Sequence, residues 1–376
     1  MKKILIICGG LQVGGAEKVA ANICIYEKSR EFEFHYVVFE GNENVYGKEI
    51  EDVGGKVFEV PSPSTSYVQY VKKLVKLIKK YQYIAVHSHT MFNSGINLLI
   101  AYVMKVPCRI AHSHTTKTET RVSAKQKIYE TFMRWIICKT STTYFACGVE
   151  AGEWLFGKKN FHKKGYVIKN GIDVEMYSFS IETREKIRKK LGLENKFVIG
   201  HSGTILPLKN QIFLVELLPE ILRRKDAVLI LMGNGPEEYV SQLKSVVREQ
   251  NLETKVFFCG CIDNVYEYLS ALDVFAFPST REGTPLAVIE AQANGLPCII
   301  SDVIPDDVKI TELVKKVPLH EKIKWIEELC NAERKIDLQY AKILSDRGYD
   351  IQTSMNEIYR TYRESKHGKR NSRFII

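Results

Sequence analysis

The feature that most constrains the fold is an alternation of short β-branched runs with amphipathic helical stretches, which continues almost from end to end. This alternation is typical of right-handed βαβ units around a parallel sheet. In the first half, the expected strands are residues 4–8, 34–39, 83–87, 108–112 and 143–147. The expected helices between them are residues 16–29, 68–81, 96–104 and 124–137.

The pattern starts again after a turn signal at Asn170 to Asp173 and a charged stretch from Glu182 to Lys190. The expected strands of the second half are 197–201, 228–232, 256–259, 274–277 and 298–301, and the helices are 211–224, 237–250, 265–271 and 285–294. We therefore predict an α/β protein with two Rossmann-like, doubly wound parallel-sheet domains, residues 1–172 and 173–345, that face a central cleft.

The formal net charge of +10 calls for an anionic partner. Nucleic acid, anionic lipid and phosphorylated substrates all fit, but no nucleic-acid-binding signature is present. No apolar run approaches the length of a membrane span, and the N-terminal run is too short for a signal peptide, so we expect it to form the first strand. The nine cysteines lie mostly in apolar segments, which favours buried thiols in a reducing cytoplasm, with Cys259 and Cys261 as core residues rather than zinc ligands.

A glycine-rich loop from Gly9 to Glu17 follows the first expected strand and opens a helix. Backbone N–H groups in such a loop, here those of Gly14 and Gly15, can approach an anion at the positive end of the helix. The loop carries neither the dinucleotide nor the P-loop fingerprint. A purely structural turn between strand and helix explains it equally well.

A second candidate site is the segment Ser279 to Pro285 and the helix after it. We expect Thr284 to cap this helix and Pro285 to be its first residue, which leaves Glu282 in the loop and Glu290 inside the helix. The two carboxylates are then staggered by roughly 7 to 8 Å along the axis. They could hold two hydroxyl-bearing rings joined by a diphosphate, although glutamates at this spacing are also common on surfaces.

Two histidine pairs, His87 with His89 and His112 with His114, each place both rings on one face of a strand. A metal site would need a third ligand and further supporting partners, so we expect none. Two basic segments stand apart from these motifs: a lysine-rich stretch at 71–80, and 125–139 with Lys127, Arg134 and Trp135. They are either solvated faces of core helices or surfaces that dock to anionic lipid.

The segment from Asp273 to Asp302 resembles the signature of retaining family 4 glycosyltransferases, in which two glutamates are separated by seven residues. Other stretches agree in order and spacing: GGAE at Gly14 to Glu17, AHSHT at Ala111 to Thr115, ACG at Ala146 to Gly148, NGID at Asn170 to Asp173, GTILPLKN at Gly203 to Asn210 and MGNGP at Met232 to Pro236. The likeness covers about residues 1 to 305 and is strongest to the polysaccharide-assembly branch, which builds bacterial capsules and exopolysaccharides. It implies the two-lobed GT-B architecture, with a tail at 346–376 that packs back on the N-terminal, acceptor-binding domain.

The resemblance also implies a role for each matching residue. Glu290 would bind the nucleotide ribose, and Glu282 with the amides of Gly283 and Thr284 would hold the donor sugar. Lys209 would neutralise the diphosphate, with the Gly14 and Gly15 backbone closing over it. His114 would face the reacting centre. Thr204 stands where the family usually has an arginine, so one of two expected diphosphate cations is missing.

The expected activity is therefore that of a retaining hexosyltransferase. It would move a sugar from a nucleotide sugar, which we expect to be UDP-linked, to a lipid-linked oligosaccharide, without a metal or other cofactor. Such an enzyme would work in the cytoplasm, associated peripherally with the anionic inner face of the plasma membrane. A UDP-sugar 2-epimerase of the same fold is the nearest alternative, and a basic nucleic-acid-binding protein is the alternative from another class.

Overall fold

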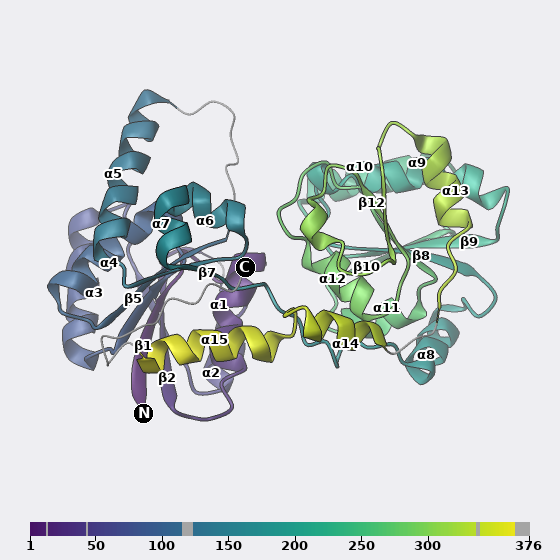
Figure 1. The fold of residues 1–376 in the computed structure, drawn as a ribbon. Helices are drawn as coiled ribbons and strands as arrows, with labels where there is room; N and C mark the ends of the chain where they lie inside the picture. Colours follow the sequence, from purple (N-terminus) through teal and green to yellow (C-terminus); the bar gives the residue numbers. More distant parts are fainter. Residues whose placement is uncertain (13, 43, 115–122, 336–338, 365–376) are drawn as a thin grey trace. The chain divides into compact units, whose positions relative to one another are not determined.

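The computed structural model describes residues 1–12, 14–42, 44–114, 123–335 and 339–364, and it divides into two compact units. One unit contains residues 1–171 and the end of the chain from Ile351, and the other runs from Ile172 to Asp350 (Figure 1). The first boundary thus lies one residue from the expected position, and the second lies five residues later. Tyr349 explains the later return, because its backbone carbonyl accepts a hydrogen bond from the amide of Ile172 and its ring packs in the core of the second unit.

The N-terminal unit is built on a seven-stranded parallel sheet with the order β3-β2-β1-β4-β5-β6-β7. Its strands are β1 (Lys2–Ile7), β2 (Phe32–Phe39), β3 (Lys56–Val60), β4 (Ala85–Ser88), β5 (Cys108–Ser113), β6 (Thr143–Ala146) and β7 (Gly165–Val167). The helices of this unit are α1 (Gly15–Ile25), α2 (Gly47–Asp52), α3 (Tyr67–Tyr81), η1 (Met91–Asn93), α4 (Ser94–Val103), α5 (Ala124–Thr140), α6 (Val149–Phe156), α7 (Lys158–Lys164) and α15 (Ile351–Glu364).

Strand β1 shows why both faces of this sheet are covered. Ile4 and Ile6 point to one face and Leu5 and Ile7 to the other, because side chains alternate along a strand. Helices α1, α2 and α15 cover the first face, and α3 to α7 cover the second. A sheet that is buried on both faces needs such continuous apolar strands.

The C-terminal unit repeats the plan with a six-stranded parallel sheet in the order β10-β9-β8-β11-β12-β13. Its strands are β8 (Phe197–Ser202), β9 (Ala227–Met232), β10 (Val256–Gly260), β11 (Val274–Phe277), β12 (Cys298–Ser301) and β13 (Val314–Val317). Its helices are α8 (Ile181–Leu191), η2 (Pro207–Lys209), α9 (Gln211–Leu222), α10 (Glu237–Glu249), α11 (Val265–Ala271), α12 (Leu286–Ala293), η3 (Asp306–Val308), α13 (Lys322–Cys330) and α14 (Gln339–Asp346).

Both strand orders reverse direction at one point, between β1 and β4 and between β8 and β11. In open parallel sheets, ligands bind outside the carboxyl ends of the strands at this reversal. The prediction of two α/β domains with parallel sheets is confirmed. The loops that follow these four strands are therefore the candidate ligand sites. Among the described residues, no helix combines the length and apolar character needed to cross a bilayer.

Candidate functional site

The loops that follow β8 and β11 carry a largely buried ion pair at the reversal point of the C-terminal sheet. Lys209 ends the short helix η2, and its Nζ lies 2.6 Å from Oε1 of Glu282 in the loop after β11. The two side chains are only 19% and 11% exposed. The Lys209 ammonium also lies 5.2 Å from the centre of the Phe277 ring. Two residues assigned to donor chemistry are therefore in direct contact.

Backbone contacts hold the loop that carries Lys209. Its start is tied to the loop after β9, since the amide of Ile205 donates to the Asn234 carbonyl over 2.9 Å. A Cβ on Gly233 would overlap the Gly203 carbonyl oxygen, and a Cβ on Gly235 would overlap that of Ile205. Only glycine allows the two loops to approach so closely, which explains the MGNGP stretch in physical terms.

A buried histidine supports the same loop through the side chain of Gln211. His201 Nδ1 donates to the Ala276 carbonyl over 3.0 Å, which leaves Nε2 to accept from the Gln211 side-chain amide at 3.2 Å. The same Gln211 amide donates to the Thr204 carbonyl over 3.0 Å. Burial lowers the pKa of His201 to about 4, so the ring is neutral near pH 7. This chain of contacts fixes the backbone at Thr204, the position without the expected arginine.

The helix after the Glu282 loop begins one residue later than the sequence predicted. Helix α12 starts at Leu286, with Pro285 in the N-cap position and no side-chain capping bond. The Thr284 hydroxyl instead donates to the Asp307 carboxylate over 3.4 Å. The prediction of Thr284 as the cap was wrong. The N-cap position falls on Pro285, because Pro285 has extended rather than helical backbone and the helix starts only after it. Gly283 lies exposed in this loop, and Glu290 lies half-buried on α12.

In the N-terminal unit, the glycine-rich loop after β1 does open a helix. Gly14 is the N-cap of α1 with extended backbone, and Gly15 is the first helical residue and exposed. No heavy atom lies within 4 Å of the position of a Cβ on Gly15. The Glu17 carboxylate, however, folds over Gly14.

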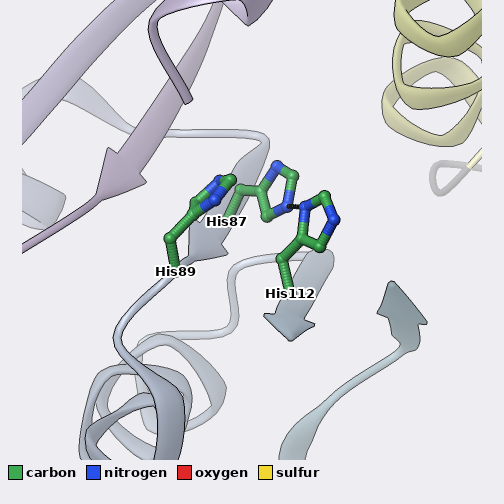
Figure 2. Close-up of side chains that lie close together, drawn as sticks. All are labelled: His87, His89 and His112. Atoms are coloured by element: carbon green, nitrogen blue, oxygen red, sulfur yellow. Dashed lines mark hydrogen bonds between the residues drawn. The ribbon is translucent and has the colours of Figure 1, made fainter. Parts of the chain in front are cut away.

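The two histidine pairs form one cluster at the carboxyl ends of β4 and β5. Strand β4 borders the reversal point, and the glycine-rich loop follows β1 across from it. Figure 2 shows His87, His89 and His112 close together. His87 Nε2 lies 3.2 Å from Nδ1 of His112, and His89 Nδ1 lies 2.7 Å from Nε2 of His114. Tyr362 reaches the cluster from α15, with its hydroxyl 2.7 Å from Nδ1 of His87. As expected, each pair places both rings on one side of its strand.

Burial determines the protonation of this cluster. It lowers the pKa of His87, His89 and His112 well below the ordinary value, and neighbouring histidines add to the effect. Burial lowers the pKa of His114 to about 4. All four rings are therefore neutral near pH 7, and they can exchange hydrogen bonds in pairs.

His87, His89 and His112 could also hold a metal ion, since one ring nitrogen from each lies within 4.8 Å of the others. Nε2 of His89, Nε2 of His112 and Nδ1 of His114 have no hydrogen-bond partner among the described residues. The sequence did not suggest that the two pairs would meet through His87 and His112.

One large hollow, of about 660 Å³, lies away from these sites. It is lined by residues such as Arg184, Arg188 and Arg334 at the amino end of the C-terminal sheet. The guanidinium groups of Arg184 and Arg188 are bound to Asp273, each at 2.5 Å. These cations therefore stabilise the domain itself, and we do not assign the hollow to the donor site.

Comparison with known proteins identifies the family. Residues 13–176 match the family described as Glycosyltransferase Family 4, and residues 183–328 match the family described as Glycosyl transferases group 1. The chain is 31% identical to EpsF of Bacillus subtilis (strain 168), assigned as a glycosyltransferase, over 96% of both chains. The protein is a family 4 glycosyltransferase. One of its relatives is named for capsular polysaccharide biosynthesis.

Two further relatives and one solved structure resemble this glycosyltransferase. It is 31% identical to the UDP-Gal:alpha-D-GlcNAc-diphosphoundecaprenol alpha-1,3-galactosyltransferase of Escherichia coli over 66% of both chains. It is 28% identical to the capsular polysaccharide biosynthesis glycosyltransferase CapH of Staphylococcus aureus over 84% of this chain and 85% of CapH. The structure of HepE from Anabaena in complex with UDP superposes with a TM-score of 0.78 at 20% identity, over 97% of this chain and all of HepE. That likeness supports the GT-B fold of the glycosyltransferase.

Sequence reasoning missed the residues that support the loops around Lys209. Gly233 and Gly235 were visible as part of a motif, but their role depends on the loop against which they pack. His201 and Gln211 carry no local signal of function. Their contacts with Ala276 and Thr204 exist only in the folded enzyme.

Proposed function

We propose that the enzyme transfers a sugar, with retention of configuration, from a UDP-sugar to a hydroxyl of a lipid-linked oligosaccharide in capsule or exopolysaccharide assembly. The observation that carries this proposal is the Lys209–Glu282 pair at the reversal point of the C-terminal sheet. The E. coli relative, named for a UDP-galactose donor and a diphosphoundecaprenol acceptor, supports the choice of substrates. The complex of HepE with UDP supports the choice of nucleotide.

Lys209 has the position and charge to bind the donor diphosphate. Its ammonium is held by Glu282 at 2.6 Å, so it need not be ordered when the substrate arrives. A fixed cation in a poorly solvated site stabilises the negative charge that develops on a leaving nucleotide. In this proposal Glu282 positions Lys209 and also contacts the donor sugar, with the amides of Gly283 and Thr284 beside it. Glu290, one helix turn into α12, binds the ribose hydroxyls.

We propose that catalysis needs no divalent cation. The sequence contains no Asp-x-Asp motif, the usual clamp between a metal and a diphosphate. Lys209 and the backbone amides of the donor loops would then supply the positive charge. The histidine cluster serves as a neutral hydrogen-bonding network in this view, because its four rings are paired with one another and with Tyr362.

The N-terminal unit is proposed to bind the acceptor. His114 directly follows β5, and its Nδ1 is buried without a partner among the described residues, so we assign it a hydrogen bond to a substrate hydroxyl. The backbone amides of Gly14 and Gly15, at the start of α1, are proposed to bind the donor diphosphate instead. A lipid-linked acceptor would bring the enzyme to the anionic inner face of the plasma membrane from the cytoplasm.

A thermal-shift panel of nucleotide sugars tests the donor assignment. A UDP-sugar at 100 times its Kd should stabilise the C-terminal unit by about 2.7 kcal/mol, and EDTA should not reduce the effect. Lys209→Ala should weaken the response to UDP-sugars, while Lys322→Ala, which removes an exposed lysine paired with Glu216, should not. Stabilisation that requires added Mg²⁺ would contradict the cation-independent proposal. Consumption of the donor without any acceptor would favour a 2-epimerase instead.

A further inference from the structure

The positive charge of this chain is concentrated in one stretch. Residues 61–140 contain thirteen Lys and Arg against two Asp and Glu, a net charge of +11, whereas the whole chain carries +10. The rest of the chain therefore carries a net charge of −1. The stretch includes helices α3, α4 and α5, which all pack on the same face of the N-terminal sheet. A local charge of this size points to a local anionic partner.

Helix α5 carries an unusual row of exposed apolar side chains within this stretch. Ile128, Phe132 and Trp135 are 71%, 54% and 58% exposed. Their spacing of four and three residues places them on one face of the helix, and the Phe132 and Trp135 rings stack with their centres 6.1 Å apart. We name these three residues the α5 stripe. Figure 1 shows α5 beside α4 at the edge of the unit.

In the first half of α5, only Tyr129 packs against the domain core, and it is half-buried. The first buried residue of the helix is Met133, and residues 124–132 are all exposed or half-buried. A soluble helix is normally held by an apolar face that packs on its own domain. Here the stripe lies outside that packed face. Lys125, Lys127 and Lys139 on the same helix are exposed, and Glu130 is its one acidic residue.

We propose that the α5 stripe is a membrane-docking surface that inserts into the boundary between headgroups and acyl chains of an anionic bilayer. Tryptophan, phenylalanine and isoleucine flanked by lysines form the composition typical of interfacial helices. The lysines attract the anionic lipid, and the three apolar side chains provide the part of the binding that salt does not screen. The role of this docking rests on the proposed lipid-linked acceptor, although the surface can be tested without it.

Lipid fits this surface better than protein or nucleic acid. The cores of protein interfaces are depleted of lysine, whereas here lysines flank the stripe along the helix. A nucleic-acid surface would use aromatic rings but would gain nothing from an exposed isoleucine. Helix α3 differs from α5, because its apolar residues Tyr70, Leu74 and Ile78 are buried. We therefore assign electrostatic attraction to α3 and insertion to α5.

Tryptophan fluorescence gives a direct test. Of the three tryptophans, Trp325 is fully buried and Trp154 is half-buried against Phe92, so a spectral change on lipid binding reports Trp135. With vesicles of phosphatidylglycerol and phosphatidylcholine, the full-length enzyme should bind and its emission should shift to shorter wavelength. Lipids brominated on the acyl chain should quench this emission. Trp135→Phe should keep the binding and lose both signals.

Substitution separates insertion from electrostatic attraction. The triple variant Ile128→Ser, Phe132→Ser, Trp135→Ser should bind these vesicles at least about 100-fold more weakly, since burying each apolar side chain is worth roughly tenfold. Ile323→Ser is the matched control, because Ile323 is 70% exposed on α13 of the other unit. It should change vesicle binding by less than about twofold. Both variants should keep the wild-type response to UDP-sugars and the wild-type rate on a water-soluble acceptor.

Three results would overturn the proposal while leaving the donor chemistry intact. The first is a triple variant that binds vesicles as tightly as the wild type. The second is a wild type that ignores anionic vesicles at low salt yet still binds UDP-sugars. The third is self-association of the wild type that the triple variant loses, which would assign the stripe to a second copy of the chain.

Discussion

At the scale of single residues, the proposed donor site depends on one ion pair. Lys209 and Glu282 are both mostly buried, so removing either partner leaves a charge that water cannot fully solvate. In the proposed mechanism, the donor binds to this existing pair.

Lys209→Ala should lower turnover by a factor of about 10² to 10³, because the variant loses one preorganised cation facing the developing diphosphate charge. Steady-state rates with saturating donor measure the effect. Lys322→Ala supplies the matched control, since its ion pair is exposed and distant in sequence from the donor loops. A Lys209→Ala enzyme that keeps more than about half its turnover would remove Lys209 from the mechanism.

Substitution of Glu290 and of Glu282 should have different effects on UDP affinity and on turnover. Glu290→Gln should raise the Kd for UDP with a smaller effect on turnover, since a ribose contact acts on ground and transition states alike. Glu282→Gln should lower turnover with a smaller effect on the Kd for UDP, because it loosens Lys209 and the contact with the donor sugar. Isothermal titration with UDP and single-turnover rates distinguish the two. An unchanged UDP affinity in Glu290→Gln would show that the ribose is bound elsewhere.

The histidine cluster should make the N-terminal unit sensitive to acid. The folded pKa of His114 is lowered from 6.5 to about 4 by burial, so below pH 6.5 the unfolded chain binds more protons than the folded one. Stability is complete above pH 6.5 and is lost as the pH falls toward 4. His114 alone should contribute a loss of about 2 kcal/mol between pH 7.5 and pH 5.

Urea unfolding at these two pH values, monitored for the N-terminal unit, measures that loss. The pKa values of His87, His89 and His112 are lowered in the same direction, so the observed loss should exceed that of His114 alone. His114→Gln should reduce the difference between the two pH values. Equal stability at pH 5 and pH 7.5 would show that the rings are solvated.

At the scale of elements, the proposed donor site depends on how closely two loops approach. Gly233→Ala should cost at least about 3 kcal/mol, because Gly233 has a φ of +140° and its Cβ would overlap the Gly203 carbonyl. UDP affinity should fall as well, since the displaced loop leads to Lys209. Gly260→Ala is the control: its φ is also positive, at +68°, but no atom lies near the added Cβ. It should cost about 1 to 2 kcal/mol and leave UDP affinity unchanged.

Most central elements could be predicted from the sequence, because buried parallel strands form continuous apolar runs. The edge strands β3 (KVFEV) and β13 (VKKV) were missed, since each mixes charged with apolar residues and has a partner on one side only. Helices α2, α6 and α7 were missed because six to eight residues are too few to show a helical period. Helix α1 ends at Ile25, four residues before the expected end.

The site could be predicted in part. Lys209, Glu282 and Glu290 could be named because short motifs carry them, and the roles given to them remain predictions. The contact between Lys209 and Glu282 joins residues 73 positions apart and depends on the order of β8 and β11, which no local pattern specifies. The expectation that most cysteines are buried held for Cys8, Cys24, Cys108, Cys298 and Cys330, but Cys261 is exposed.

At the scale of the whole molecule, the last described helix belongs to the first unit. Residues Ile351, Met355, Ile358, Tyr359 and Tyr362 of α15 lie in the same apolar cluster as Ile4 and Phe34. The tail expected at 346–376 thus does return to the N-terminal unit, from Ile351 onward, and its residues beyond Glu364 lie outside the described part.

Truncation after Asp350 should therefore unfold the N-terminal unit and leave the C-terminal unit able to bind UDP. The lost cluster includes two aromatic side chains with less than 5% exposure, each of which buries a large apolar area. Calorimetry should show two transitions in the full chain and the loss of one in the truncated chain. Truncation after Glu364 is the control and should leave both transitions in place. A chain ending at Asp350 that retains both would mean that α15 is dispensable.

The position of α15 also determines when the core of the N-terminal unit can be completed during translation. The N-terminal unit is translated up to Gly171, but its core stays incomplete until α15 has left the ribosome, after the 179 residues of the C-terminal unit. At about 5 to 20 residues per second, that delay is on the order of 10 to 35 seconds. During this interval Phe32 and Phe34, which α15 covers in the folded enzyme, stay accessible to chaperones. The nascent chain should therefore depend on chaperones at its beginning more than at its middle, although the beginning is made first.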